Sequence, residues 1–107
     1  MSIELEEWGR EGVMNLCCPT CRGNNLHQRR ITVWDRQEDA RQVRYTTVSD
    51  AVSTMMAENH LSSNPSDRRQ GVSIVFECET CAEEHDEHEL CFAQHKGFTL
   101  VFWRKTQ

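Results

Sequence analysis

Two cysteine pairs with the same spacing are the strongest chemical signal in this chain, and they point to metal binding. Each pair follows the pattern Cys-X-X-Cys, and the pairs are Cys18 with Cys21 and Cys78 with Cys81. Four thiolates form a complete tetrahedral ligand set for a structural zinc ion, and a closed set leaves no coordination position for a catalytic water. The sequence therefore predicts one structural zinc ion bound by Cys18, Cys21, Cys78 and Cys81.

The other cysteine chemistries stay open at the level of the sequence. Cys17 could replace Cys18, although the Cys-X-X-Cys spacing lets backbone N–H groups point at both sulfurs. Six cysteines could form three disulfides in a secreted protein. An acidic start, without the basic and then apolar order of a signal peptide, favours reduced thiols and a cytoplasmic location instead. Two redox pairs are a further alternative, but neither pair has the strand-to-helix context of that chemistry. Cys91 fits a buried apolar position in a strand.

Length and composition predict one small domain that depends on its metal ion. The 107 residues are 37% hydrophobic, and the mean hydropathy is −0.70. A single domain over 1–107 is expected, and so lean a core is often stabilised by a metal ion or disulfides. A structural zinc ion contributes roughly 10–16 kcal/mol, against a usual net stability of about 5–15 kcal/mol. No apolar run is long enough to span a membrane.

Alternation of apolar and polar residues predicts strands in most of the chain. Residues 26–34 and 42–48 form a predicted hairpin, and residues 72–76 form a strand that leads into the second cysteine pair. Residues 90–94 and 98–103 form a last hairpin, in which a three-residue turn would place Leu90 opposite Phe102.

Two other segments are less regular in sequence. Residues 1–13 are expected to be flexible or a short helix. Residues 49–70 are expected to be an irregular or helical insertion, with Val52, Met55 and Met56 at helical spacing. In the first cysteine turn, Gly23 is expected to supply a positive φ.

Two cysteine turns joined by antiparallel strands are typical of a zinc ribbon. We call residues 18–21 the first knuckle and residues 78–81 the second knuckle. The predicted fold is mostly β: a zinc-ribbon-like antiparallel sheet with two knuckles, hairpins and a short helix in the insertion. Because 56 residues separate Cys21 from Cys78, against about 15–20 in compact sites, the ribbon would carry a large insertion.

Several motifs resemble small zinc-ribbon proteins encoded by phages, prophages and other mobile elements. The resemblance covers residues 16–104, and its motifs are Asn-Pro-Ser-Asp-Arg-Arg-Gln-Gly at 64–71, Phe-Glu-Cys-Glu-Thr-Cys at 76–81, Gln-His-Lys-Gly at 94–97 and the first knuckle. The knuckles are common to many zinc ribbons, whereas the other motifs are more distinctive. The resemblance implies a zinc-ribbon fold and a bacterial or phage setting, and it implies no activity.

Charge is distributed unevenly along a chain of net charge −5. Residues 22–44 carry six arginines against three acidic residues, whereas residues 77–89 carry seven acidic residues and no lysine or arginine. The overall charge has the wrong sign for strong nonspecific nucleic-acid binding. Guanidinium groups nevertheless bind phosphates, and aromatic rings stack on bases. A charge-balanced, solvated hairpin explains the arginines about as well as a weak nucleic-acid interface formed by Arg29, Arg30, Arg41, Arg44 and Tyr45.

Together these patterns predict a zinc-stabilised, non-catalytic accessory or regulatory protein that binds nucleic acid. The alternative is a protein-interaction module in which the zinc ion is structural and the acidic segment 77–89 meets a basic partner. A third hypothesis is an enzyme with a second metal ion, and a solvated acidic surface is favoured over it at Glu84, His85, His88, Glu89 and His95. No Ser-His-acid set, phosphate-binding glycine loop or carboxylate pair predicts catalysis, and no pattern predicts the oligomeric state.

Overall fold

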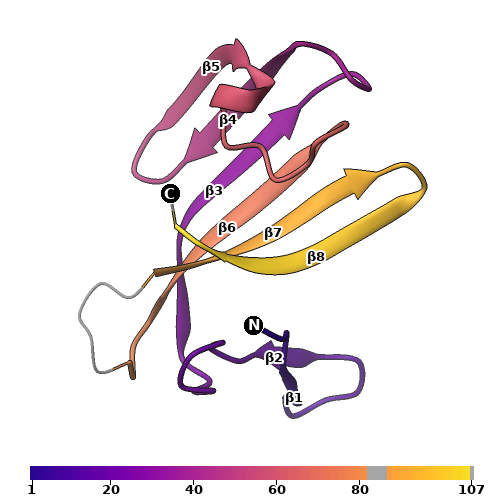
Figure 1. The fold of residues 1–107 in the computed structure, drawn as a ribbon. Helices are drawn as coiled ribbons and strands as arrows, with labels where there is room; N and C mark the ends of the chain where they lie inside the picture. The colour runs from indigo at the N-terminus through magenta and orange to yellow at the C-terminus, as the bar shows by residue number, and fades with distance from the viewer. Residues whose placement is uncertain (82–86, 107) are drawn as a thin grey trace.

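The computed structural model, which describes residues 1–81 and 87–106, contains one six-stranded antiparallel sheet in the order β5-β4-β3-β6-β7-β8 (Figure 1). A separate two-stranded sheet pairs β1 with β2, and a short 3-10 turn, η1, follows β5. The prediction of a mostly β fold with antiparallel sheets is confirmed. The elements are β1 (Leu5–Glu7), β2 (Met14–Leu16), β3 (Leu26–Asp35), β4 (Gln42–Val48), β5 (Val52–Glu58), η1 (Asn59–Leu61), β6 (Gly71–Cys78), β7 (Glu87–His95) and β8 (Phe98–Lys105).

The prediction of a helix in the insertion, residues 49–70, is wrong. Residues 52–58 form strand β5, which pairs with β4 without interruption from Val48–Val52 to Gln42–Glu58. An isolated helix of this length is marginal in water, whereas the edge of β4 offers backbone hydrogen bonds to alternate residues of the segment. The hydroxyls of Thr46 and Thr54 also meet across the two strands at 3.0 Å. The remaining helical structure is η1, which is three residues long.

The two ends of the chain also differ from expectation. Residues 5–7 are not helical, because they pair with β2 in the small sheet. The last hairpin has a two-residue turn, Lys96-Gly97, in which Lys96 has a φ of 56°, the sign that tight hairpin turns require. Leu90 therefore lies opposite Trp103 and not Phe102. This register places the larger Trp103 ring on the buried side, next to Phe76 at a centroid distance of 6.0 Å.

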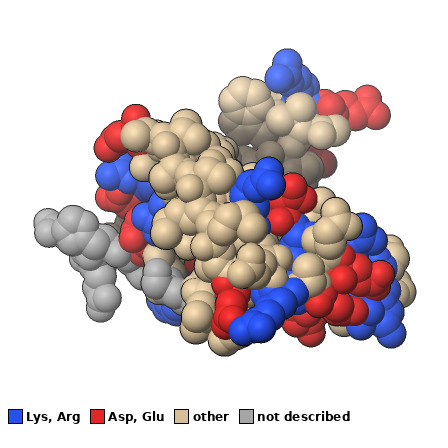
Figure 2. All heavy atoms as spheres, turned by 90° about the horizontal axis from the view of Figure 1, so that it is seen from above, with Lys and Arg blue, Asp and Glu red and all other residues tan. Residues whose placement is uncertain are grey.

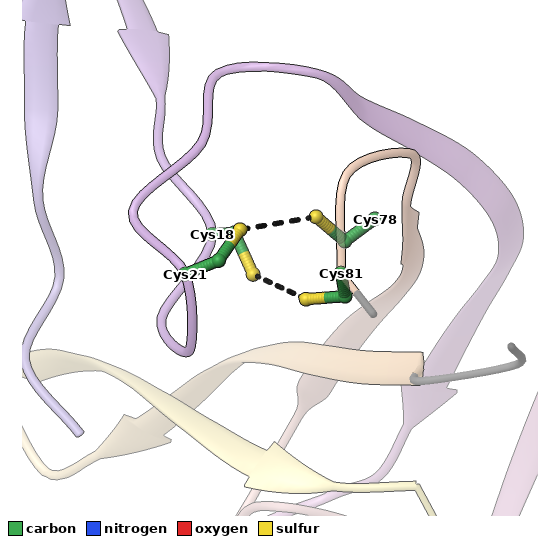
Figure 3. A group of neighbouring side chains, drawn as sticks. All are labelled: Cys18, Cys21, Cys78 and Cys81. Atoms are coloured by element: carbon green, nitrogen blue, oxygen red, sulfur yellow. Dashed lines mark hydrogen bonds between the residues drawn. The ribbon is translucent and has the colours of Figure 1, made fainter. Parts of the chain in front are cut away.

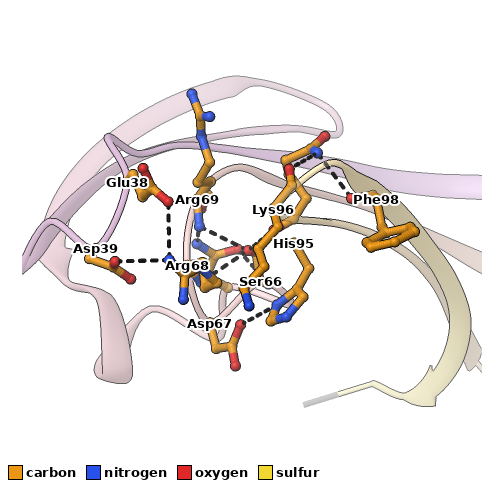
Figure 4. Close-up of polar contacts among 11 residues, drawn as sticks. Glu38, Asp39, Ser66, Asp67, Arg68, Arg69, His95, Lys96 and Phe98 are labelled. Carbon is orange, nitrogen blue, oxygen red and sulfur yellow. Dashed lines mark hydrogen bonds and ion pairs between the residues drawn. The ribbon is translucent and has the colours of Figure 1, made fainter.

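One face of the large sheet, which we call the covered face, lies under residues 59–70. The indole Nε1 of Trp34 donates to the carbonyl of Ser62 at 2.9 Å, and the Ser66 hydroxyl donates to the carbonyl of Gln94 at 2.7 Å. The same hydroxyl accepts the backbone N–H groups of Arg68 and Arg69 (Figure 4). These bonds attach the covering segment to both halves of the sheet.

On the opposite face, which we call the open face, one row of apolar side chains crosses all six strands. Side chains of cross-strand neighbours project to the same side of a sheet, so one continuous row contains Val52, Val48, Ile31, Ile74, Leu90 and Trp103. At the end of this row Leu90, Trp103 and Phe76 form a buried cluster, against which Leu16 and Leu26 pack. Toward β4 and β5 the row is exposed.

Candidate metal centre

The two knuckles are brought together by the pairing of β3 with β6. Cys78 is the last residue of β6 and lies opposite Leu26 at the start of β3. Next to this pair, the backbone N–H of Glu79, which follows Cys78, donates to the carbonyl of Asn25, which precedes Leu26, at 3.0 Å. Since the first knuckle directly precedes β3, this register places it against the second knuckle (Figure 3).

The first knuckle closes on itself through backbone hydrogen bonds. The N–H of Cys18 donates to the carbonyl of Gly23 at 2.8 Å, and the N–H of Arg22 donates to the carbonyl of Cys18 at 2.9 Å. The positive φ of this turn belongs to Arg22, at 62°, so its assignment to Gly23 is wrong. Gly23 is instead needed for space, because a Cβ there would lie 2.5 Å from the Thr80 hydroxyl oxygen.

The four cysteines predicted as ligands converge on one point. Their Sγ atoms all lie within 4.8 Å of one another, with Cys18 at 3.6 Å from Cys81 and Cys21 at 3.5 Å from Cys78. A tetrahedral ion with metal–sulfur bonds of about 2.3 Å would place its sulfurs about 3.8 Å apart. The cluster therefore has the dimensions of a four-thiolate metal site and could hold a metal ion.

Neither disulfides nor Cys17 fit this geometry. All six cysteines are free, and the shortest sulfur separations exceed the roughly 2.05 Å of a disulfide bond. Cys17 is buried outside the cluster, and its thiol points at the carbonyl of Asn15 at 3.9 Å. Burial, followed by Glu6 and Glu4, raises the pKa of Cys17, which disfavours the thiolate that a metal ion requires.

Hydrogen bonds to sulfur prepare Cys21 as a thiolate. The Thr80 hydroxyl lies 3.4 Å from Cys21 Sγ, and the backbone N–H of Gly23 donates to the same sulfur at 3.3 Å. Together, with Thr80 the larger contributor, they lower the pKa of Cys21 to about 6. Thr80 also lies 3.5 Å from Cys78 Sγ, so one hydroxyl serves a sulfur from each knuckle.

The other two sulfurs lie in a less polar setting. Burial raises the pKa of Cys18, although the N–H of Thr20 lies 3.4 Å from its sulfur. Burial is also the largest cause that raises the pKa of Cys81, followed by the neighbouring cysteines. Thiols bind a metal ion as thiolates and release their protons to water, so an ion that binds these two sulfurs must offset a larger cost of deprotonation.

Sequence reasoning missed the role of Thr80, although a signal was present. Both knuckles carry threonine immediately before their second cysteine, as Thr20 and Thr80. The Thr20 hydroxyl lies 3.3 Å from Nε2 of His88. His88 and Glu89, which were expected on a solvated acidic surface, are buried in β7, because His88 packs against the ring of Trp103 and Glu89 pairs with Arg104.

The second metal site, which was the less favoured alternative at the level of the sequence, is not assembled in the part of the chain that the structure describes. There, the four cysteines are the one group with the spacing to hold an ion. Glu84 and His85 lie outside the described residues. Glu89 is 2.7 Å from Arg104 Nη2, and His95 is 3.3 Å from Asp67 (Figure 4), so each of these two side chains has another partner.

The residues predicted to bind nucleic acid do not form one surface. Arg29 is 3.0 Å from a carboxylate oxygen of Glu77, and Arg41 donates from Nε to Glu58 at 2.9 Å. On the face of the molecule shown in Figure 2, basic and acidic residues lie beside one another and do not separate into patches of one sign. Ion pairing thus neutralises much of the charge that made this hairpin basic.

The remaining predicted residues lie on different sides of the sheet. Arg44 is exposed on the open face, and no ion pair within the described residues involves it. Arg30 and Tyr45 lie on the covered face, where Tyr45 stacks on the buried Trp34 at a centroid distance of 6.3 Å. Tyr45 is half-buried, and this packing uses one face of its ring.

Comparison with protein-family models, curated proteins and solved structures finds no match for this chain. The fold and the sulfur cluster therefore define its class, a small antiparallel β protein with a four-cysteine centre that could hold a metal ion. Among the described residues, no helix has the length and apolar character to cross a membrane.

Replacement of Gly23 by alanine should weaken metal binding by about tenfold or more. The new Cβ would lie 2.5 Å from Thr80 Oγ1 and 3.1 Å from Cys21 Sγ, so the hydroxyl must turn away from the two sulfurs that it serves. Competition with a chromophoric chelator measures the affinity. In a Thr80→Ala background the same change should cost much less, and an equal cost in both backgrounds would contradict this account.

Proposed function

We propose that this protein is a zinc-stabilised β module that binds another protein through its open face and performs no catalysis itself. The observation that carries the proposal is a patch of exposed apolar side chains, Val33, Val48 and Val52, on the β3–β5 half of that face. The zinc ion would act as a structural centre, because four thiolates complete its coordination and leave no position for a substrate or a water.

Zinc is proposed on the chemistry of the ligand set. Thiolates are soft ligands that favour zinc, copper(I) or iron–sulfur clusters over magnesium or calcium. Paired Cys-X-X-Cys turns on antiparallel strands are the usual frame of a four-cysteine zinc site. The sulfur separations of 3.5 and 3.6 Å suit a single tetrahedral ion. Analysis of the purified protein should therefore yield one zinc ion per chain.

The open face exposes apolar side chains where a solvated sheet would carry polar ones. Val33, Val48, Val52 and Met56 are 46, 45, 69 and 57% exposed. The register brings Val48 beside Val52 and also beside the half-buried Ile31. Contiguous exposed apolar surface of this kind marks interaction sites in soluble proteins.

The neighbouring sheet edge supports the same proposal. β5 is the last strand of the sheet, so its outer backbone groups have no strand beside them. Residues 52–57 contain no charge and no proline, the two devices by which edge strands usually avoid pairing with another chain. A partner that covers the open face could therefore also add a strand to β5.

Nucleic-acid binding is the second candidate function, and Arg44 is the observation that favours it. Its guanidinium group is exposed and unpaired within the described residues, and it lies beside Met56 on the open face. The pairing of Arg29 and Arg41 with carboxylates, together with the net charge of −5, supports a protein partner more strongly. We also propose a phage or mobile-element setting, which the motif resemblance alone supports.

A matched pair of variants tests the proposed function. Val33 and Leu100 are 46 and 45% exposed, and they lie on the open and the covered face of the sheet. Val33→Lys should reduce recovery of partner proteins from nuclease-treated bacterial extract by about tenfold or more, because it buries a charge in the interface. Leu100→Lys should leave recovery unchanged. Thermal melting verifies that both variants are folded.

Three other outcomes of this experiment would decide against the proposal. If Val33→Lys and the unmodified protein recover the same proteins, the open face is not the binding surface. Self-association that Val33→Lys abolishes, measured by light scattering, would assign the face to a second copy of the chain. Salt-sensitive binding of DNA or RNA that Arg44→Gln abolishes and Val33→Lys leaves intact would favour the second candidate.

A further inference from the structure

A cavity on the covered face is lined by a buried arginine, Arg36, which forms no ion pair with any acidic residue that the structure describes. The cavity has a volume of about 500 Å³ and lies between the turn that joins β3 to β4 and the segment 59–67; its lining includes Arg36, Arg41, Asn59, His60, Ser63 and Asn64. This volume is in the usual range for small-molecule sites, about 300–1,000 Å³. The cavity is on the opposite side of the sheet from the proposed protein-binding face.

Arg36 is the residue that distinguishes this cavity from an ordinary surface hollow. Its side chain is buried, with only 9% of the residue exposed. Nε donates to the carbonyl of Ala40 at 2.7 Å, while Nη1 is buried and has no hydrogen-bond partner among the residues that the structure describes. Within the described residues, no carboxylate forms an ion pair with Arg36. A buried cation without a counter-charge is costly, and an anion bound in the cavity would remove that cost.

The rim of the cavity adds further donors. Arg41 and His60 have exposed side chains that lie close to the same carboxylate, Glu58. Asp67 is the one acidic residue that lines the cavity, and its exposed carboxylate already contacts His95. Glu58 thus balances the charge of Arg41 at the rim, and the buried Arg36 is the charge that favours an anionic ligand.

The walls of the cavity are held rigidly by hydrogen bonds within the covering segment. The side-chain amide of Asn64 donates to Asn59 Oδ1 at 2.8 Å and to the carbonyl of Arg69 at 3.1 Å, and its oxygen accepts the N–H of Ser66. The N–H of Asn59 donates to the carbonyl of Arg41 at 2.8 Å. Such bonds preorganise a site, which reduces the ordering cost of binding.

From this arrangement we propose that the cavity binds a phosphate group through the guanidinium group of Arg36. The planar fork of a guanidinium matches two oxygens of a phosphate, and His60 and the hydroxyl of Ser63 supply donors for the others. The volume leaves room for the group that carries the phosphate, so the ligand is a phosphate ester. This inference does not depend on the proposed protein partner.

Titration with sodium phosphate and with adenosine monophosphate, followed by NMR, tests the proposal at constant ionic strength against sodium chloride. We expect saturable shifts of residues around the cavity in the unmodified protein. Arg36→Gln should weaken binding about tenfold or more, and Arg36→Lys should weaken it less, because a lysine keeps the charge and loses the fork. Arg44 is an exposed arginine outside the cavity, so the Arg44→Gln variant should bind phosphate as tightly as the unmodified protein does.

His60→Ala provides a variant that should fold in any case, since the His60 side chain is 70% exposed. Its expected effect is about threefold weaker binding. The proposal is overturned if phosphate causes no saturable shifts in the unmodified protein, or if Arg36→Gln folds and binds as tightly. If Arg36→Gln does not fold, unchanged binding in both Arg36→Lys and His60→Ala would overturn it.

Two oligonucleotides distinguish the source of the phosphate. If the ligand is the terminal phosphate of a nucleic acid, a strand with a 5′-phosphate should bind more tightly than the same strand with a 5′-hydroxyl. Arg36→Lys should then reduce the difference. If the ligand is a free phosphate ester, adenosine monophosphate should bind, and the two strands should not differ in affinity. Either result supports a phosphate site, and both leave the test of the open face unaffected.

Discussion

Removal of the metal ion should unfold most of this domain. Cys21 and Cys78 are 57 positions apart in the sequence. Their sulfurs meet where the end of β6 lies beside the start of β3. Binding of a structural zinc ion contributes roughly 10–16 kcal/mol at neutral pH, which equals or exceeds the usual net stability of about 5–15 kcal/mol. The metal-free chain should therefore lose its cooperative thermal transition, as followed by circular dichroism with and without a strong chelator.

A pair of buried cysteines in neighbouring strands provides the control for this experiment. Cys78 and Cys91 are 7 and 0% exposed, and only Cys78 belongs to the sulfur cluster. Cys78→Ala should abolish stoichiometric metal binding and behave like the chelated protein. Cys91→Ala should keep its metal ion and lose only about 1 kcal/mol, the cost of a small cavity. An unchanged melting curve after complete removal of the metal would refute the structural role of the ion.

Replacement of Gly71 by alanine should destabilise the protein by about 2–3 kcal/mol, the effect of overpacking a rigid site. Gly71 is buried in β6 between Trp34 and Ala93 on the neighbouring strands. A Cβ there would overlap Oδ1 of Asn64 and lie 2.7 Å from Cγ of Pro65. The expected decrease in Tm is roughly 10–20 °C, measured on the metal-loaded protein.

The covering segment cannot easily move away from such a side chain. Asn64 is held by its bonds to Asn59 and Arg69, and Ser66 is bonded to Gln94 of β7. Gly97 is the matched control, because a Cβ at that position meets nothing within 4 Å. Gly97→Ala should change the Tm little. Equal Tm values for the two variants would show that the covering segment is not packed on Gly71 as described.

The effects of metal removal and of Gly71→Ala would distinguish two contributions to the stability of the fold. A metal ion held by the four cysteines would join the two knuckles at one end of the sheet, whereas the segment 59–70 covers one face farther along. If both expectations hold, the open face is left as the large apolar surface without an internal cover. This explains why the proposed partner is assigned to that face and not to the acidic segment 77–89, part of which pairs within β6 and β7.

Local patterns in the sequence determined most of the strands and the group of cysteines. The alternation in residues 26–34 and 42–48 led to β3 and β4 almost residue for residue, because strand pattern is a property of neighbours in the chain. The Cys-X-X-Cys spacing likewise identified the four sulfurs that the structure brings within 4.8 Å of one another. Such spacing reflects the size of the ion and is independent of the rest of the fold.

Only the tertiary structure decided which strands are neighbours, which side of the sheet is covered, and which charges are neutralised. Val52, Met55 and Met56 have helical spacing, yet the free edge of β4 makes this segment a strand. The basic hairpin loses much of its charge to Glu58 and Glu77, which are distant in sequence. The buried position of Arg36 likewise depends on a segment more than twenty residues away. Long-range packing and pairing set these properties, because they depend on contacts that no local pattern of residues encodes.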